Sequence, residues 1–493
     1  MIEFVKLENK EFLKEEGGGT MHNNSMADII YDYFTSRIVF GYYLLGDQLP
    51  SISYICRQFQ VSALTVRTAL IRMREEGYIE TTERKRSIVT FRPDEQQEQR
   101  YRNAFLSRRE GMNDMCRNSD ILFRPIVHYY LQRQTEDSIK QIRSQLKKRK
   151  GHPAKQINMF YAEAMRPLNN SLALNLHWEM VRYLQTPYLQ RPANFEDSDT
   201  AAEHIEQMLS LIEAGNIEKA LEMTQAFSKN VTQMFFESLG VMLDTPEPVK
   251  QIPFEWQIYR EHPQMCYTLA AELMSKIDAR IYKQEELLPP CQALAQKYDV
   301  SLITMRRTLE LLNDIHVTET QNGVGTRVIS GRLSGPPDLS HLQIRKCLLM
   351  LLQAMQMSAL TCKNVAVHTL SSLDDEGFQA LEREIGCLTE EGTPFLAAKA
   401  CLRFIGENSS SAFIREVYRQ LYLLLQWGHA LHMFSQKLDA GRFYEDYAES
   451  LREKLCRRDI GGFAENLSEL MKKNVVGTRA LLLELGFKKE QLV

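Results

Sequence analysis

The sequence predicts a mainly α-helical chain in which one two-domain unit is written twice. Three observations predict it. The decapeptide VSALTVRTAL at 61–70 returns as VSLITMRRTL at 300–309. Apolar residues recur at helical spacing through most of the 493-residue chain. A long stretch with the same helical pattern follows each decapeptide, and self-similarity on this scale indicates duplication.

The first decapeptide belongs to a small domain of three helices. A helix is expected over 28–45, and Pro50 in the turn 46–51 suits the start of a second helix over 52–59. Ser62 is expected to cap a third helix that Gly77 ends. The inward stripes of the first and third helices are Ile30, Tyr33, Phe34, Ile38 and Val66, Ala69, Leu70, Met73.

Two short strands around a charged tip are expected next, over 78–91. Three helices and a β-hairpin, with a tight turn before the third helix, make a winged helix-turn-helix. The second copy aligns without a gap and keeps the paired positions Leu49-Pro50 and Leu288-Pro289, Val61-Ser62 and Val300-Ser301, Arg67 and Arg306, Val89 and Val328. Its elements are expected over 270–282, 287–301, 302–314 and 317–330, with Met305, Thr308, Leu309 and Leu312 inward.

The order of these motifs resembles one family. The first copy resembles the DNA-binding domain of GntR-family bacterial transcription regulators. The resemblance rests on the order of a helix, G..LPS, a short helix, F.VS..TVR.AL, EGYI and a wing. The second copy matches these motifs less closely but keeps their order and spacing. The resemblance implies binding to double-stranded operator DNA through the third helix and the wing. The DNA-contacting candidates are Ser62, Ala63, Leu64, Thr65, Arg67, Arg84, Lys85, Arg86, Ser301, Thr304, Arg306, Arg307, Gly323, Gly325 and Arg327.

The chain departs from the family at two arginine positions. The family carries an arginine directly after the capping serine, but this chain has Ala63 and Leu302 there. The family carries another arginine early in the second helix, where this chain has ISYI (52–55) and CQAL (291–294). Arginine is the usual reader of guanine, whereas Ala63 and Leu64 are suited to contact thymine methyl groups. The apolar pair Leu302-Ile303 equally suits a protein contact.

The segments after each winged helix are expected to be all-helical, with long stripes over 157–184 and 200–231 and again over 394–428 and 445–475. The first resembles the ligand domain of the fatty-acid-responsive branch of the family, through Glu203-His204 and Gly215-Asn216. That branch often holds a metal through Asp and His. Here those ligands are missing from 157–161 and the last His is absent, so no metal and no cofactor are expected. Tyr161, Trp178 and His204 are the candidates for binding an unidentified small metabolite, with hydrophobic molecules as the candidate class.

Other classes of protein find little support. The formal net charge is −3, so any nucleic-acid face must be local. Nine cysteines without a CxxC pair predict reduced thiols in the cytoplasm. The apolar run 347–360 is too short to span a bilayer, so no membrane contact is expected. No nucleophile–base spacing, HExxH or phosphate loop is present, and no enzyme activity is expected.

These observations give domain boundaries and a function. Residues 1–25 are expected to be a disordered leader, because the Glu-Glu-Gly-Gly codons before Met21 are purine-rich like a ribosome-binding site; Met21 or Met26 is the expected start. The winged helices are placed at 26–93 and 264–331, and the helical domains at 94–250 and 332–493. We expect a transcription regulator that is either a monomeric pseudo-dimer reading two unlike half-sites or a homodimer. The alternative is a relative that binds proteins instead of DNA.

Overall fold

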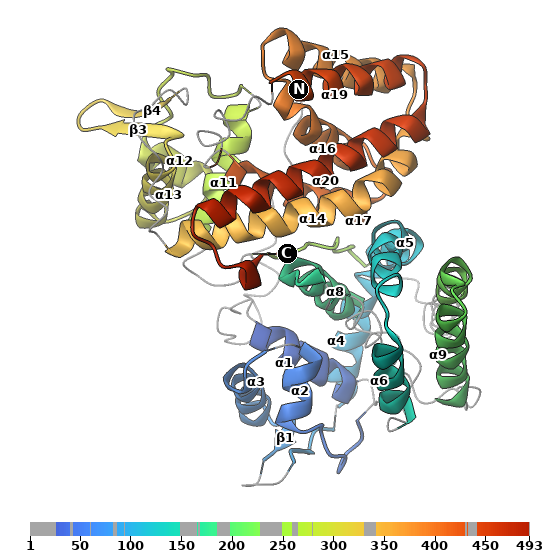
Figure 1. The fold of residues 1–493 in the computed structure, drawn as a ribbon. Coiled ribbons are helices and arrows are strands. Elements are labelled where there is room, and N and C mark those ends of the chain that lie inside the picture. The colour runs from blue at the N-terminus through green and yellow to red at the C-terminus, as the bar shows by residue number, and fades with distance from the viewer. Residues whose placement is uncertain are drawn as a thin grey trace.

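The computed structural model describes residues 26–39, 43–59, 61–81, 86–92, 94–147, 165, 168–184, 198–226, 249–258, 265–278, 280–329, 342–428, 431 and 441–492. The expected leader, 1–25, lies outside the described residues. The described part is mainly helical, with two small antiparallel hairpins, as the sequence predicts. In Figure 1 the blue N-terminal domain lies at the bottom, and the yellow to red second half forms the upper part.

The first winged helix contains α1 (Met26–Val39), α2 (Ile52–Phe59), α3 (Ala63–Glu75), β1 (Ile79–Glu80) and β2 (Ile88–Val89). Its core is built from the predicted stripes, with Phe34, Val66 and Met73 all fully buried. The first helix is shorter than expected, since residues 43–45 are not helical and lead into a turn at Gly46, whose φ is 90°. The amide of Gly46 instead donates to the carbonyl of Val89.

The second winged helix contains α11 (Met265–Asp278), α12 (Cys291–Lys297), α13 (Leu302–Asp314), β3 (Thr318–Gln321) and β4 (Gly325–Val328). Its first helix lies closer to the N-terminus than the predicted 270–282, because the chain turns at Arg280 with a φ of 57°. The two winged helices share their backbone pairing: the amide of Leu49 donates to Ser87 at 2.9 Å, and that of Leu288 donates to Thr326 at 2.8 Å. The duplication therefore extends to individual hydrogen bonds.

The first helical segment contains α4 (Glu95–Leu106), α5 (Arg109–Leu131), α6 (Glu136–Lys147), α8 (Ser171–Leu184), α9 (Ser198–Glu213) and a helix over 217–226. The predicted break at EAGN is confirmed, with Gly215 at a φ of 76°. In the second segment are α14 (Leu342–Leu370), α15 (Asp375–Glu390), α16 (Ala397–Glu407), α17 (Ala412–Leu425), α19 (Gly441–Cys456) and α20 (Ile460–Glu484). The stripe over 394–428 is divided because Ser411 caps a new helix there.

Helices α5, α8, α14 and α17 join the two halves in a reciprocal way. Helix α5 packs against α14 and α17, while α8 of the first half packs against α14. Asp114 of α5 accepts from Ser411 and from the amide of Phe413 at the start of α17. In turn, Asn170 at the start of α8 donates to Gln356 of α14 at 2.7 Å. Each half thus contacts the N-terminus of a helix in the other half.

The segment 249–258 between the halves is inserted at this junction. The indole nitrogen of Trp256 donates to Asn175 at 2.8 Å, and its backbone amide donates to Glu416 at 3.0 Å. Asn175 is the fifth residue of α8, and Glu416 is the fifth residue of α17. Trp256 is fully buried, so one side chain of the connecting segment is packed between equivalent positions of the two halves.

Each winged helix rests on the helical segment of its own half. Helix α1 packs against α8, and α11 packs against α17. The ring centroids of Tyr33 and Trp178 are 6.0 Å apart, and those of Tyr267 and Trp427 are also 6.0 Å apart. A buried tryptophan therefore contacts the first helix of the winged helix in both copies, and both winged helices are fixed to the helical part in similar ways.

Candidate nucleic-acid interface

The third helix of each winged helix begins at a serine cap, as predicted. The hydroxyl of Ser62 accepts the amide of Thr65 at 3.2 Å and lies 2.9 Å from the Thr65 hydroxyl. Ser301 and Thr304 repeat the arrangement at 3.1 Å and 2.8 Å. In each copy the serine and threonine side chains therefore bond to each other at the helix start, and they fix where the exposed face begins.

The exposed face of α3 is largely apolar at its N-terminal end. Ala63, Leu64 and Arg67 are all exposed, and Leu64 keeps 73% of its surface in contact with solvent. Thr68 is exposed as well, but its hydroxyl donates to the carbonyl of Leu64 at 3.1 Å, within the helix. Ile71 continues the exposed side one turn further. The long cationic side chain at the N-terminal end of this face is Arg67, which is exposed as the sequence predicts.

The exposed face of α13 has the same apolar start but a more charged continuation. Leu302 and Ile303 are 41% and 63% exposed. Arg306 and Arg307 follow them and are exposed, and so is Glu310. The opposite face is formed by the predicted inward residues, which are buried. The two third helices thus share an apolar first turn and differ in the charges behind it.

The wings are described in part. Arg84 and Lys85 lie outside the described residues, and Arg86 is exposed at the start of the returning segment. In the second wing, Gly323 and Gly325 have φ values of 78° and 132°, so each position favours glycine. Arg327 donates to the backbone carbonyl of Glu285 at 2.9 Å. Its guanidinium is therefore partly engaged in holding the wing against the turn before α12.

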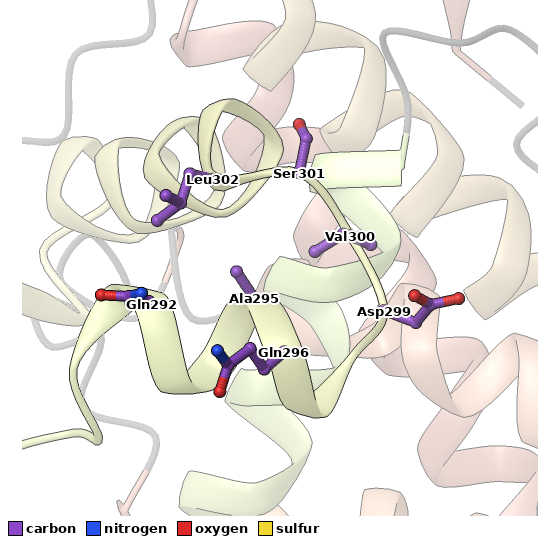
Figure 2. A pocket seen from close by; sticks show the side chains of 7 residues that line it. All are labelled: Gln292, Ala295, Gln296, Asp299, Val300, Ser301 and Leu302. Atoms are coloured by element: carbon purple, nitrogen blue, oxygen red, sulfur yellow. The ribbon is translucent and has the colours of Figure 1, made fainter.

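A shallow hollow of about 520 Å³ borders the turn between α12 and α13. Figure 2 shows Gln292 and Gln296 on α12 and Leu302 at the first turn of α13. Both glutamines are exposed, and amide groups can donate to phosphate oxygens. A sequence search for arginine alone misses them, since it does not consider neutral donors. The hollow is lined by Gln292, Ala295, Gln296, Asp299, Val300, Ser301 and Leu302.

The candidates for ligand binding are not brought together by the described residues. Tyr161 lies outside the described residues. Trp178 is fully buried in the core of the first winged helix, where its ring lies 4.4 Å from that of Phe59. His204 lies on α9, whose buried residues form a separate cluster with α5 and α6. Burial lowers the pKa of His204, and a hydrogen bond to the backbone of Met223 opposes this shift.

Metal sites and membrane spans were considered for the described part of the chain. No group of three or more His, Cys, Asp or Glu side chains there is placed to hold a metal ion. The residues 157–161, where the family pattern places metal ligands, lie outside the described residues. None of the described helices is long and apolar enough to cross a membrane.

Two winged helices with exposed third helices define a DNA-binding protein of the winged helix class. A model of the bacterial regulatory proteins of the gntR family matches residues 26–89 and again 267–328. The chain therefore carries the DNA-binding domain of the GntR family twice, which supports a transcription regulator.

Comparison with whole proteins adds little detail. No curated protein matches the chain. A solved GntR structure from Streptococcus agalactiae is 17% identical, covers 44% of this chain and 99% of its own, and has a TM-score of 0.21. The Listeria monocytogenes protein Lar, described as controlling the expression of the agr system and mediating virulence, is 15% identical. Its match covers 46% of this chain and 100% of its own, with a TM-score of 0.23.

Proposed function

We propose that this chain is a single-chain regulator that supplies both DNA readers of an operator by itself. The observation that carries the proposal is the reciprocal junction between the halves. In a two-fold symmetric dimer, residue i contacts j and j contacts i. The contact of Asp114 of α5 with the start of α17, and that of Gln356 of α14 with Asn170 at the start of α8, repeat this reciprocity between helices within one chain.

The two half-sites of the proposed operator are unlike, because the two readers differ at equivalent exposed positions. Thr68, whose hydroxyl is bonded within its helix, stands where the second copy has Arg307. Ile71 stands where it has Glu310. Arginine and glutamate make direct hydrogen bonds to guanine and cytosine edges, which isoleucine cannot make. An asymmetric operator is therefore expected rather than a perfect inverted repeat.

The helical segments are proposed to sense a small metabolite without a metal ion, with hydrophobic molecules as the candidate class. The proposal is supported by the packing of the first winged helix against α8. Trp178 of α8 packs on Phe59 of the first winged helix, and the ion pair of Arg182 with Asp32, at 2.6 Å, joins the same two elements. A ligand that moved α8 would move the first winged helix with it. Tyr161 and His204 remain the further candidates for this ligand.

A second candidate function is binding to another protein through the third helices. The exposed Leu302 and Ile303 favour it, because neighbouring exposed apolar side chains are a feature of protein interfaces. Arg67 and Arg306, exposed beside the apolar turn in both copies, favour DNA instead. The two functions differ in how binding responds to salt, since DNA binding releases counterions.

The deciding experiment is binding of the purified full chain to its own upstream intergenic DNA across a salt series. Arg67→Ala and Arg306→Ala are compared with Arg457→Ala, an exposed arginine of the helical part. If each of the two reads a base, its removal costs about 1–3 kcal/mol and lowers the salt slope, while Arg457→Ala has no effect. If only Arg67→Ala weakens DNA binding, the second winged helix does not read a base and has a structural role. If a binding-site selection also returns no specific sequence, the protein-binding alternative takes its place.

A further inference from the structure

The first turn of each recognition helix presents an aliphatic side chain to solvent. Leu64 and Ile303 occupy equivalent places, each two residues after the capping serine. They are among the most exposed large apolar residues of the described chain. Neither belongs to a hydrophobic cluster of the described residues. The fold of the winged helices does not account for an aliphatic residue at these two places.

The polar groups around Leu64 are already bonded within the helix start. Ser62 and Thr65 pair with each other, and the Thr68 hydroxyl is bonded to the Leu64 carbonyl. Arg67 is the long donor next to them at the N-terminal end of the exposed face. A base edge that meets the first turn of α3 therefore meets an apolar surface. The C5-methyl of thymine is the one apolar group that bases present in the major groove.

We propose that Leu64 and Ile303 are specificity-determining residues that read thymine methyl groups, one in each half-site. This inference rests on the proposed DNA-binding function and names the bases that the function would select. Arg67 and Arg306, one turn further along each helix, favour a phosphate-lined groove over an apolar protein surface as the occupant. The operator is then expected to hold, in each half-site, a thymine that faces the first turn of the third helix.

Replacing thymine by deoxyuracil tests the inference, because the substitution removes the methyl group and leaves the base-pairing groups unchanged. The operator is first obtained by binding-site selection with the full chain. Each thymine is then replaced in turn. We expect one position in each half-site where the change weakens binding about fourfold, which corresponds to about 0.8 kcal/mol for one buried apolar carbon.

Protein variants assign each methyl group to its reader. Leu64→Ala should abolish the difference between thymine and deoxyuracil in one half-site, and Ile303→Ala should abolish it in the other. Arg67→Ala should weaken binding to the thymine and deoxyuracil probes equally, so that the ratio of the two affinities is unchanged. Leu483→Ala changes an exposed leucine of α20 and serves as the matched control. Thermal melting of each variant verifies that the fold is intact.

The outcomes separate this inference from the proposed function. Specific DNA binding with equal affinity for thymine and deoxyuracil probes overturns the inference and leaves the regulator function standing. If replacing one particular thymine by deoxyuracil still weakens binding in both the Leu64→Ala and the Ile303→Ala variants, at each such position, the inference is overturned as well. Absence of specific binding to any DNA overturns both, and capture of a protein through the same apolar residues would then explain their exposure.

Discussion

The carboxylate of Asp114 accepts a hydrogen bond from the backbone amide of Phe413 at 2.7 Å, across 299 residues of sequence. The same oxygen accepts from the hydroxyl of Ser411, the N-cap of α17. A carboxylate at this place satisfies an amide that the helix itself leaves unpaired, and it interacts favourably with the helix dipole. The start of α17 is therefore completed by a residue from the other half of the chain.

Removing this carboxylate should destabilise the chain. We expect Asp114→Ala to lower the free energy of unfolding by about 1–2 kcal/mol, as the loss of a capping group does. Urea denaturation followed by circular dichroism measures the change. Asp137→Ala, at an exposed position of α6, is the matched control. Equal stability of the two variants would contradict a role for Asp114 in joining the halves.

The connecting segment should be a major source of stability. Trp256→Ala removes a fully buried indole and should cost about 3–5 kcal/mol. Trp256→Phe keeps most of the packing but leaves Asn175 without its donor, and about 1–3 kcal/mol should be lost. Ile252→Ala alters an exposed residue of the same segment and should change little. Chemical denaturation of the three variants checks the order.

The proposed single-chain regulator should bind its operator as one chain. Light scattering or native mass spectrometry of the complex is expected to give a mass of one 57.2 kDa chain plus one DNA duplex. The reason within the proposal is that α5 and α8 of the first half pack against α14 and α17 of the second half, in place of contacts between two subunits. A complex of two chains on one perfect inverted repeat would show instead that one copy reads both half-sites.

Stability should depend on pH through Glu272. This residue of α11 is partly buried against α17, and burial raises the pKa of its carboxyl group, while Lys276 and Arg419 oppose the shift. A carboxyl group with a raised folded-state pKa takes up its proton earlier in the folded chain than in the unfolded chain. The stabilisation is therefore complete below the unfolded value of about 4.3 and is lost as the pH rises through the folded-state pKa.

The check is a comparison of wild type with Glu272→Gln, which does not titrate. As the pH falls from about 7 to about 4, the wild type should gain stability relative to the variant, since the unfolded pKa lies near the lower limit. Glu136→Gln, at an exposed position, is the control for the general effect of losing a charge. A stability difference that stays constant across the series would refute the linkage.

Local features of the fold are predictable because neighbouring residues produce them. Ser62 and Ser301 bond to amides three residues along the chain, and the spacing of Val66 and Met73 places them on one side of a helix. The winged helices and the exposure of Arg67 follow from these patterns. The ends of the first helices do not, because residues 43–45 and Arg280 already lie in turns where the apolar pattern predicts helix.

The sequence by itself determined the duplication, the two winged helices with their GntR-type motifs, and the exposed face of each third helix. Tertiary structure alone decided that Asp114 completes α17, that Trp256 lies between α8 and α17, and that Trp178 packs on the first winged helix. Periodicity shows that a side chain will be buried, but it does not show against which partner. These partners lie far away in the sequence, and packing of the two halves brings them together.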